Sequence, residues 1–312
     1  MSLRSKMRFV KRFMVEPDFR FNFLAFYGYK NSVSSEEFVK RIYRYKTGKE
    51  LNLNDPVLYT EKLQWLKLYD CRNEYTEMVD KLAAKKFVAD RIGAQYVVPL
   101  LGVWDTAEEM DFRSLPDQFV LKTTHDSGTY LICKDKNSLD IDAAKRKMRR
   151  YLRRNYYDCS REWPYKNVKP RIIAESYMED TRQGELRDYK FFTFGGVPKV
   201  LYIAQGRGKG TQTYTDFFDM EFNHLPFTID HEIAPEHPEK PVNFELMKEL
   251  AAKLSEGIPQ LRVDFYEVDG KVYFGEMTFF HCSGMAPFHP EEWDRTFGEW
   301  VILPEKRTEE LA

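Results

Sequence analysis

The segment from Leu261 to Gly284, LRVDFYEVDGKVYFGEMTFFHCSG, constrains the fold more strongly than any other part of the sequence. It holds two runs rich in β-branched and aromatic residues, joined at Asp269-Gly270, a dipeptide typical of tight turns between antiparallel strands. We therefore predict a β-hairpin in this segment. Pairing across its turn brings Asp264 of the first strand beside Glu276 of the second.

The carboxylates of this hairpin indicate a cation site. Two adjacent carboxylates in a partly dry site repel each other unless a cation lies between them. Hard oxygen ligands of this kind suit magnesium, which usually also holds substrate phosphates. Arg262 faces the same way as Asp264, because residues two apart on a strand share a face. Together with the Thr278 hydroxyl, these side chains predict a nucleotide-phosphate site. A surface hairpin with a salt bridge is the alternative.

Composition argues against several other classes of protein. A chain of 312 residues is long enough for one large or two medium domains. Its formal net charge of -1 gives the whole molecule no polyanion-binding character, so no nucleic-acid partner is expected. The four cysteines have no CxxC spacing, which favours a reducing cytoplasm over a disulfide framework. No apolar run reaches the roughly 20 residues needed to span a bilayer.

The N-terminal segment begins with basic residues and lacks the long apolar core and cleavage site of a signal peptide. Two placements are open for it. It can lie at an anionic membrane surface, or it can dock as a helix on the protein's own core. In the first case its apolar side consists of Met7, Phe9, Val10, Phe13 and Met14.

Helices are predicted early in the chain and β-hairpins later. Residues 1 to about 75 are expected to be mostly helical, with one helix that starts at Ser34 or Ser35 and ends at Gly48. Hairpins outnumber βαβ units, which favours an α+β class over a parallel sheet. The remaining predictions are helices over Tyr75–Gly93, 141–158 and 242–259, and strands over 94–104 with a break at Pro99, 118–135, 171–178 and 188–208, the last turning at Gly195-Gly196. The helix over 141–158 is strongly basic, and we expect a solvated face there, with an anionic glycan, a membrane or a nucleic acid as alternatives.

The loop that follows QFVLK is the second candidate for phosphate binding. Small residues at Ser127 and Gly128 let the backbone approach a ligand closely and point amide groups at an anion. Lys122 ends the preceding strand and suits phosphate as a point charge. An ordinary hairpin turn with a surface lysine is the alternative. The GxGxxG and Walker A patterns are absent from the sequence.

Three charged residues on the next two strands can complete a nucleotide site. Glu175 follows an apolar run and offers an acceptor for an adenine amino group. Asp188 begins the next strand and can accept from ribose hydroxyls, and Lys190 shares its face. Each of these three also fits a surface charge when it is considered alone.

The order of these residues resembles the ATP-grasp superfamily, in which ATP lies between two α+β subdomains. Asp80-Lys81-Leu82 matches that superfamily's DK(L/Y) motif. Within it, the chain is similar to the TupA-like ATP-grasp proteins of bacterial surface-polysaccharide gene sets, from about Leu51 to Pro304. The matching segments are LNLNDPVLYTEKLQWLKLYD, VDKLAAKKFVADRIG, LPDQFVLKTTHDSG, DYKFFTFGG and RVDFYEVDGKVYFGEMTF. The resemblance implies a helical N-terminal region over 1–75 and an ATP-grasp domain over 76–312, with a lid subdomain at about 116–175 and a catalytic subdomain at about 176–305.

The resemblance also implies a role for each candidate residue. Magnesium would be bound by Asp264, Glu276 and Thr278, and the transferred phosphoryl group would be steadied by Arg262, with Lys190 nearby. The nucleotide would be held by Lys81, Lys122, Ser127 and Gly128 at its phosphates and by Glu175 and Asp188 at adenine and ribose.

Two departures from the family's pattern bear on the substrate end of the site. Thr278 stands where most ATP-grasp enzymes have asparagine, and TFFHCSG replaces the related TFTPxSG, which puts His281, Cys282 and Ser283 near the site. His281 can serve as a base for an incoming amine or can be a packed histidine, while Cys282 lacks an evident acid–base partner as a nucleophile. Arg207 and Lys209, in a glycine-rich segment, are expected to meet an anionic substrate, with a solvated loop as the alternative.

The implied activity is an ATP-dependent carboxylate–amine ligase that forms an amide through an acyl-phosphate. The family's context suggests that a uronic-acid carboxylate, glycan-linked or nucleotide-linked, is joined to an amino acid or another amine. The alternatives are a glycosyltransferase that uses a nucleotide-sugar, a non-catalytic nucleotide-binding regulator and a kinase. We expect ATP and Mg2+ as cofactors and a cytoplasmic protein that can associate with the inner face of the membrane.

Overall fold

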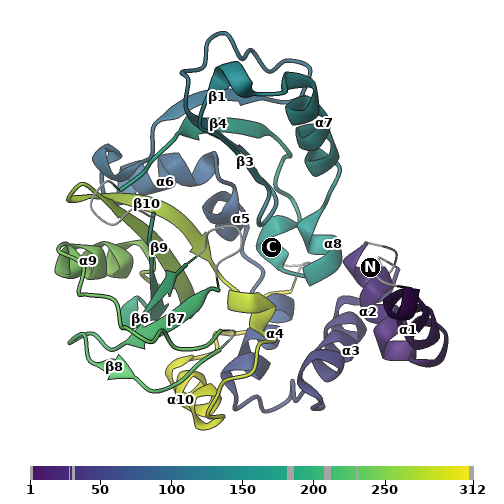
Figure 1. Ribbon diagram of the computed structural model, residues 1–312. Coiled ribbons are helices and arrows are strands. Elements are labelled where there is room, and N and C mark those ends of the chain that lie inside the picture. Colours follow the sequence, from purple (N-terminus) through teal and green to yellow (C-terminus); the bar gives the residue numbers. More distant parts are fainter. Residues whose placement is uncertain are drawn as a thin grey trace.

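Two antiparallel sheets form the body of the protein (Figure 1). The computed structural model describes residues 3–27, 29, 32–180, 186–206, 212–229 and 231–308. The smaller sheet has the strand order β1-β4-β2-β3 and the larger sheet the order β10-β9-β5-β6-β7-β8. Their bounds are β1 Leu100–Trp104, β2 Phe119–Thr123, β3 Tyr130–Cys133, β4 Ile172–Ser176, β5 Asp188–Phe194, β6 Val197–Gln205, β7 Tyr214–Phe218, β8 His224–Leu225, β9 Gln260–Val268 and β10 Lys271–Thr278. The predicted α+β class is confirmed, as are the hairpins β2–β3, β5–β6 and β9–β10.

The N-terminal part of the chain is helical, as predicted. The helices are α1 Leu3–Val15, α2 Pro17–Phe26, α3 Ser35–Thr47, α4 Tyr59–Tyr69, α5 Asn73–Val79, α6 Ala83–Arg91, α7 Ile141–Leu152, α8 Tyr156–Ser160, α9 Phe244–Leu254 and α10 Glu292–Trp300, with 3-10 turns η1 Ala94–Tyr96, η2 Lys136–Ser138, η3 Trp163–Tyr165 and η4 His281–Gly284. Both predicted ends of α3 are confirmed. The Ser34 hydroxyl accepts from the Glu37 amide at 3.3 Å, and Gly48 closes the helix at a φ of 73°.

The single helix predicted over Tyr75–Gly93 is wrong, because Asp80 interrupts it. The Asp80 carboxylate accepts from the Leu82 amide at 2.8 Å, which replaces a helical backbone bond by a local side-chain bond and starts α6. The Lys81 side chain consequently leaves the helical path, and its Nζ donates to the Asp126 carbonyl at 2.5 Å. The break therefore delivers Lys81 to the loop between β2 and β3.

Two further predictions need correction. The strand predicted over 94–104 starts only after Pro99, because the residues before it form η1 and a single bridge between Val97 and Phe274 of β10. The basic helix predicted over 141–158 ends at Leu152, and Asn155 caps a separate helix, α8, by accepting from the Tyr157 amide. Ala144 and Met148 of α7 are buried on the smaller sheet, whereas its arginines and lysines lie outward or half outward, as a solvated face requires.

Each sheet has its own core. A small cluster, which includes Phe119, Leu121 and Met148, lies between the smaller sheet and α7. The large cluster joins the larger sheet to α9 on one face and to α4 and α10 on the other. On β5, Phe191 packs on Phe244 of α9, so the alternate residues, Lys190 among them, face the opposite way.

The N-terminal helix α1 packs on α2 through part of its apolar side and leaves other apolar residues exposed. Phe9 and Phe13 pack on Phe23 of α2, with ring centroids 5.1 and 5.6 Å apart. Met7 and Met14, by contrast, have 66% and 69% of their surface exposed. Among the described residues, no helix is long and apolar enough to cross a membrane.

Candidate functional site

The β9–β10 hairpin sets Glu276 opposite Asp264, as predicted, but through an irregularity that the sequence did not reveal. From the turn to the pair Phe265–Phe274 the register is regular, and a bulge at Gly275 then shifts it, so that Glu276 pairs with Asp264. Continued without the bulge, the register would place Gly275 opposite Asp264 and turn the Glu276 side chain to the other face of the sheet. The bulge therefore brings the two carboxylates together.

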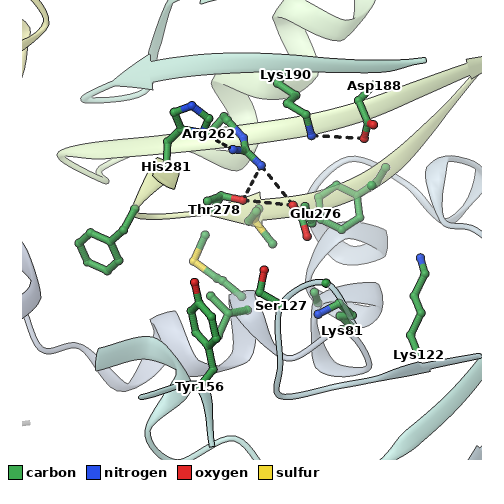
Figure 2. A pocket seen from close by; sticks show the side chains of 18 of the residues that line it. Lys81, Lys122, Ser127, Tyr156, Asp188, Lys190, Arg262, Glu276, Thr278 and His281 are labelled. Carbon is green, nitrogen blue, oxygen red and sulfur yellow. Dashed lines mark hydrogen bonds and ion pairs between the residues drawn. The ribbon is translucent and has the colours of Figure 1, made fainter. Parts of the chain in front are cut away.

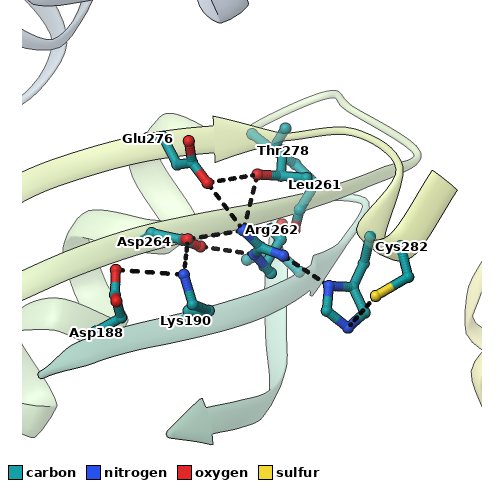
Figure 3. Close-up of polar contacts among 10 residues, drawn as sticks. Asp188, Lys190, Leu261, Arg262, Asp264, Glu276, Thr278 and Cys282 are labelled. Atoms are coloured by element: carbon teal, nitrogen blue, oxygen red, sulfur yellow. Dashed lines mark hydrogen bonds and ion pairs between the residues drawn. The ribbon is translucent and has the colours of Figure 1, made fainter. Parts of the chain in front are cut away.

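Arg262 lies at the centre of the resulting network (Figure 3). Its guanidinium donates to both oxygens of Asp264, at 2.7 and 2.8 Å, and to Glu276 Oε1 at 3.1 Å. It also donates to the Thr278 hydroxyl at 3.0 Å. Burial alone lowers the pKa of Arg262, but the Asp264 carboxylate outweighs burial and holds the pKa above its ordinary value. Arg262 is therefore charged at every physiological pH.

Lys190 and Asp188 extend this network onto the neighbouring strand. Lys190 pairs with Asp264 in the β5–β9 register, and its ammonium forms an ion pair with that carboxylate. It also donates to Asp188 at 3.3 Å. Asp264 is completely buried, so its charge is compensated by Arg262 and Lys190 rather than by water. The structure thus brings together all the hairpin and β5 residues that the sequence selected.

A cavity of about 560 Å³ separates this network from the smaller sheet, and a second set of predicted residues lines its opposite side. Figure 2 shows Lys81, Lys122 and Ser127 across the cavity from Arg262 and Glu276. Gly128, next to Ser127, has a φ of +71° with open space where a Cβ would lie, so the loop backbone is free to approach a ligand.

Glu175 holds two lysines of this opposite side. Its carboxylate pairs with Lys122 and with Lys85 of α6, each at 2.6 Å. Burial raises the pKa of Glu175, but the two lysines outweigh burial and hold the pKa below its ordinary value. Burial lowers the pKa of the Lys81 ammonium, and Glu276 across the cavity opposes that effect. Lys85 was not selected from the sequence, where it reads as one of two adjacent lysines on a helix.

The turn η4 closes one end of the cavity and carries His281. His281 is buried, its Nδ1 accepts from Arg262 at 2.6 Å, and its ring meets the Phe192 ring edge-on. This histidine is thus packed within the Arg262 network, and it also borders the cavity. The exposed Cys282 has its Sγ 3.5 Å from His281 Nε2, and Ser283 borders the cavity.

The structure adds a buried group at this end that sequence reasoning missed. Lys67 of α4, Glu162 after α8, Tyr156 and Tyr165 surround Ser283 or line the cavity beside it. Lys67 carried a usable signal, because it lies four residues after the buried Leu63 and so falls on the apolar stripe of its helix. Glu162 carried none. Arg207 and Lys209, the predicted contacts for an anionic substrate, lie outside the described residues.

Comparison of the sequence with known protein families shows which family the chain belongs to. A sequence model described as TupA-like ATPgrasp matches residues 61–302. The chain belongs to the TupA-like ATP-grasp family. No curated protein matched the chain.

Solved structures with a similar fold include three enzymes. D-alanine–D-alanine ligase from Bacillus anthracis, complexed with ATP, is 14% identical with a TM-score of 0.41, and the match covers 65% of this chain and 55% of that one. Phosphoribosylamine–glycine ligase from Thermotoga maritima is 15% identical with a TM-score of 0.41, and the match covers 66% of this chain and 48% of that one. Biotin carboxylase from Campylobacter jejuni, in a β,γ-ATP complex, is 14% identical with a TM-score of 0.42, and the match covers 73% of this chain and 47% of that one. This chain thus spans about half the length of the structures that it matches.

The TupA-like ATP-grasp family leads us to ask whether the site suits magnesium. Glu276 and Thr278 offer oxygen donors at the cavity, and the Glu276 side chain is 45% exposed there. Asp264 has both oxygens engaged by Arg262 and Lys190. A metal ion is therefore accommodated most readily when a polyanion arrives with it and draws one of these cations away from Asp264. The donor set fits magnesium on that condition.

A second cluster of possible metal ligands lies on the other face of the larger sheet. The Asp216 carboxylate is 2.7 Å from His237 Nδ1 and 3.2 Å from His224 Nε2. The two imidazole rings stack with centroids 3.9 Å apart and planes 26° apart. Nearly parallel rings direct their nitrogen lone pairs side by side rather than toward one point, and His237 Nδ1 is hydrogen-bonded to Asp216.

Proposed function

We propose that this protein is an ATP-dependent carboxylate–amine ligase that joins an amino acid or another amine to a uronic-acid carboxylate of a bacterial surface polysaccharide. One observation carries the proposal. The cavity has lysines in excess on its smaller-sheet side. On its hairpin side the network holds three carboxylates against two cations, when the buried Asp264 behind the lining is included. A polyanion that arrives with a divalent cation complements both sides at once, and Mg-ATP is such a ligand.

The first step of the proposed reaction is transfer of the γ-phosphoryl group. Lys81 and Lys122 would contact the phosphates, with the loop at Ser127 and Gly128 closing over them. The substrate carboxylate attacks the γ-phosphorus and ADP leaves, which gives an acyl-phosphate. Arg262 lies where it can offset the charge that develops on the phosphoryl oxygens.

The remaining nucleotide contacts follow from the same placement. Glu175 and Asp188 are proposed for adenine and ribose, and Lys190 for the phosphates once it releases Asp264. Magnesium, when bound by Asp264, Glu276 and Thr278, would shield the phosphate charges.

The second step is capture of the acyl-phosphate by an amine. The amine nitrogen attacks the acyl carbon, the bond to phosphate breaks, and the amide and phosphate leave. Tyr130, Tyr202 and Tyr266 line the cavity and suit a sugar, because each combines an apolar ring with a hydroxyl group. Arg207 and Lys209 are proposed to hold the acidic glycan or nucleotide that carries the uronic acid.

The decisive experiment compares Mg-ATP with a panel of nucleotide-sugars by thermal shift and calorimetry. A ligand at 100 times its dissociation constant adds about 2.7 kcal/mol of stability, which is readily measured. We expect stabilisation by Mg-ATP that is lost in Glu276→Gln, followed by ADP release and amide formation with a uronic acid and an amine. Stabilisation by a nucleotide-sugar together with indifference to ATP would replace the ligase by a glycosyltransferase.

We further propose that the protein works in the cytoplasm at the inner face of the membrane. Met7, Val10 and Met14 of α1 are exposed, and Lys6, Arg8 and Lys11 lie among them in the sequence. Apolar and basic residues together suit an anionic bilayer. In a flotation experiment with phosphatidylglycerol vesicles, the wild type should rise with the vesicles. A Met7→Ser/Val10→Ser/Met14→Ser variant should remain in the dense fraction. Equal vesicle binding of the two proteins would show that α1 does not bind the membrane.

A further inference from the structure

Glu162 is a buried carboxylate at the end of the cavity that η4 closes. The residue has only 3% of its surface exposed, yet it lines the cavity. Its Oε1 has no hydrogen-bond partner among the described residues. A buried acceptor without a donor costs free energy, about 1–3 kcal/mol or more for a charged group. Such a position is explained when a ligand supplies the missing donor.

The surroundings of Glu162 keep it away from solvent and close to one cation. The hydroxyl groups of Ser283 and Tyr156 interact with its carboxylate, and Lys67 is the nearby ammonium. Lys67 Nζ donates to the carbonyl and the hydroxyl of Ser283, at 2.8 and 2.7 Å, and to the Ser160 carbonyl at 3.3 Å. Ser283 thus connects the lysine to the carboxylate.

Burial changes the protonation of both groups. It raises the pKa of Glu162 to about 7, with Lys67 acting in the opposite direction. It lowers the pKa of Lys67 to about 8, with Glu162 opposing. Tyr156, Tyr165 and Cys159 also face this group, and burial or the Glu162 charge raises the pKa of each, so they stay neutral where Glu162 titrates.

The backbone at η4 is held in an unusual conformation beside Glu162. Cys282 and Ser283 have φ of 49° and 55°, in the left-handed region that side chains rarely adopt. Gln64 of α4 holds the turn by donating to the carbonyls of Ser283 and Gly284, at 3.1 and 2.9 Å. Strain of this kind persists where the surrounding structure requires it, and it is frequent at functional sites. Here it directs the Ser283 carbonyl and hydroxyl to Lys67.

From this geometry we propose that Glu162 is the general base for the amine, with Lys67 and Ser283 as positioning residues; the inference rests on the proposed ligase function. As the amine nitrogen attacks the acyl carbon, the bond between that carbon and the phosphate oxygen breaks, and its electron pair leaves with phosphate. Glu162 Oε1 accepts the proton that the nitrogen loses and later passes it to phosphate or water. His281 is a poorer candidate, because its Nδ1 accepts from Arg262 and its Nε2 faces Cys282.

The first test uses methylammonium, the smallest probe that carries the proposed group. Its binding to the full-length protein is measured by calorimetry in wild type, Glu162→Gln and Glu267→Gln. Glu267 is a matched control, because it is also buried and has an unpartnered Oε2 but does not line the cavity. We expect at least about tenfold weaker binding in Glu162→Gln alone, the loss of one charge-assisted hydrogen bond. Equal affinities, or no binding to the wild type, would overturn the proposal.

The second test separates the base from the ligase reaction itself. Hydroxylamine is largely unprotonated at neutral pH, so it can trap an acyl-phosphate as a hydroxamate without a protein base. With ATP and D-glucuronic acid, Glu162→Gln should keep hydroxamate formation and lose about 100-fold or more in amide formation with an amino acid. The wild-type amidation rate should rise with pH through about 7, the pKa of Glu162, and Glu162→Asp should restore part of the rate. Equal amidation rates in wild type and Glu162→Gln would overturn the role of Glu162 as the base. If the wild type forms neither ADP nor hydroxamate, the ligase function is overturned. The methylammonium result then decides whether Glu162 binds an amine.

Discussion

The two sides of the cavity carry opposite excesses of charge. On the hairpin side, Asp188, Asp264 and Glu276 outnumber Arg262 and Lys190. On the smaller-sheet side, the lysines at 81, 85 and 122 outnumber the carboxylate of Glu175. Each side alone would be a poor site, because its unbalanced charges repel one another. Together they fit a ligand that is negative toward one side and brings a divalent cation to the other.

The two sides also differ in how rigidly their charges are held. The hairpin side is built on paired strands and is bonded from Asp188 through Lys190 and Asp264 to Arg262 (Figure 3), which in turn donates to His281. The smaller-sheet side takes its residues from a helix break, a strand and a loop. We therefore expect that substitution of the fully buried hairpin charge damages both fold and function, whereas substitution of a lysine that faces the cavity from the other side mainly weakens ligand binding.

Asp264→Asn should have the largest effect. The substitution leaves Arg262 and Lys190 buried without their shared counter-charge, and breaking a buried ion pair in this way costs about 3–5 kcal/mol. Urea unfolding measures this loss. Glu276→Gln is the matched comparison, because its half-exposed side chain should cost under about 1 kcal/mol while abolishing stabilisation by Mg-ATP. Equal stability of Asp264→Asn and wild type would show that the network does not depend on that charge.

Lys122→Met should weaken ATP binding by about tenfold to a hundredfold, the usual worth of one charge-assisted contact. Stability without ligand should change far less than in Asp264→Asn, since Glu175 keeps Lys85 as its partner. Isothermal calorimetry with Mg-ATP measures the affinity. The exposed Lys134, which directly follows β3, serves as the control and should tolerate the same change. Unaltered affinity in Lys122→Met would exclude this lysine from the phosphate site.

Glu175→Gln should destabilise the protein by about 2 kcal/mol at neutral pH, because both lysines lose a buried charged acceptor. The folded-state pKa of Glu175 is depressed, so its contribution to stability is present above the unfolded pKa and disappears as pH falls through the folded pKa. The difference between variant and wild type should therefore shrink in acid. Unfolding curves at pH 7 and at a pH below about 4 test this. A difference that stays constant would assign the loss to packing rather than to charge.

Gly275→Ala should have the smallest effect, about 1 kcal/mol in stability with a partial loss of Mg-ATP affinity. A Cβ at this bulge would lie 3.1 Å from the Asp264 carbonyl and 3.3 Å from the Tyr266 ring, so the neighbouring groups must shift by a few tenths of an ångström. Gly270→Ala at the turn of the same hairpin is a comparison that strains the backbone without moving Glu276. If both variants bind Mg-ATP like the wild type, the bulge does not control the carboxylate pair.

Much of the fold and of the hairpin side could be predicted, because the signals were local. Asp269-Gly270 marks its turn, and Ser34 and Gly48 mark the ends of α3, in each case through a conformation that the residue itself prefers. The helix break at Asp80 was missed, because helical periodicity continued through it and a side-chain bond of the aspartate prevailed. The pairing of Lys85 with Glu175 was missed for another reason, since the two residues come from separate elements with no sequence relation.

The sequence by itself determined that the chain turns at Asp269-Gly270 into a hairpin that carries Arg262, Asp264 and Glu276, and which family the chain belongs to. Strand alternation, turn residues and motif order are properties of neighbouring positions, and a reader of the chain can follow them. The tertiary structure alone decided that the bulge at Gly275 turns Glu276 toward Asp264, that His281 serves Arg262, and that Lys67 and Glu162 meet through Ser283. These outcomes depend on register shifts and on burial between distant segments. Both are settled by packing, whose free energy belongs to the whole core rather than to any stretch of sequence.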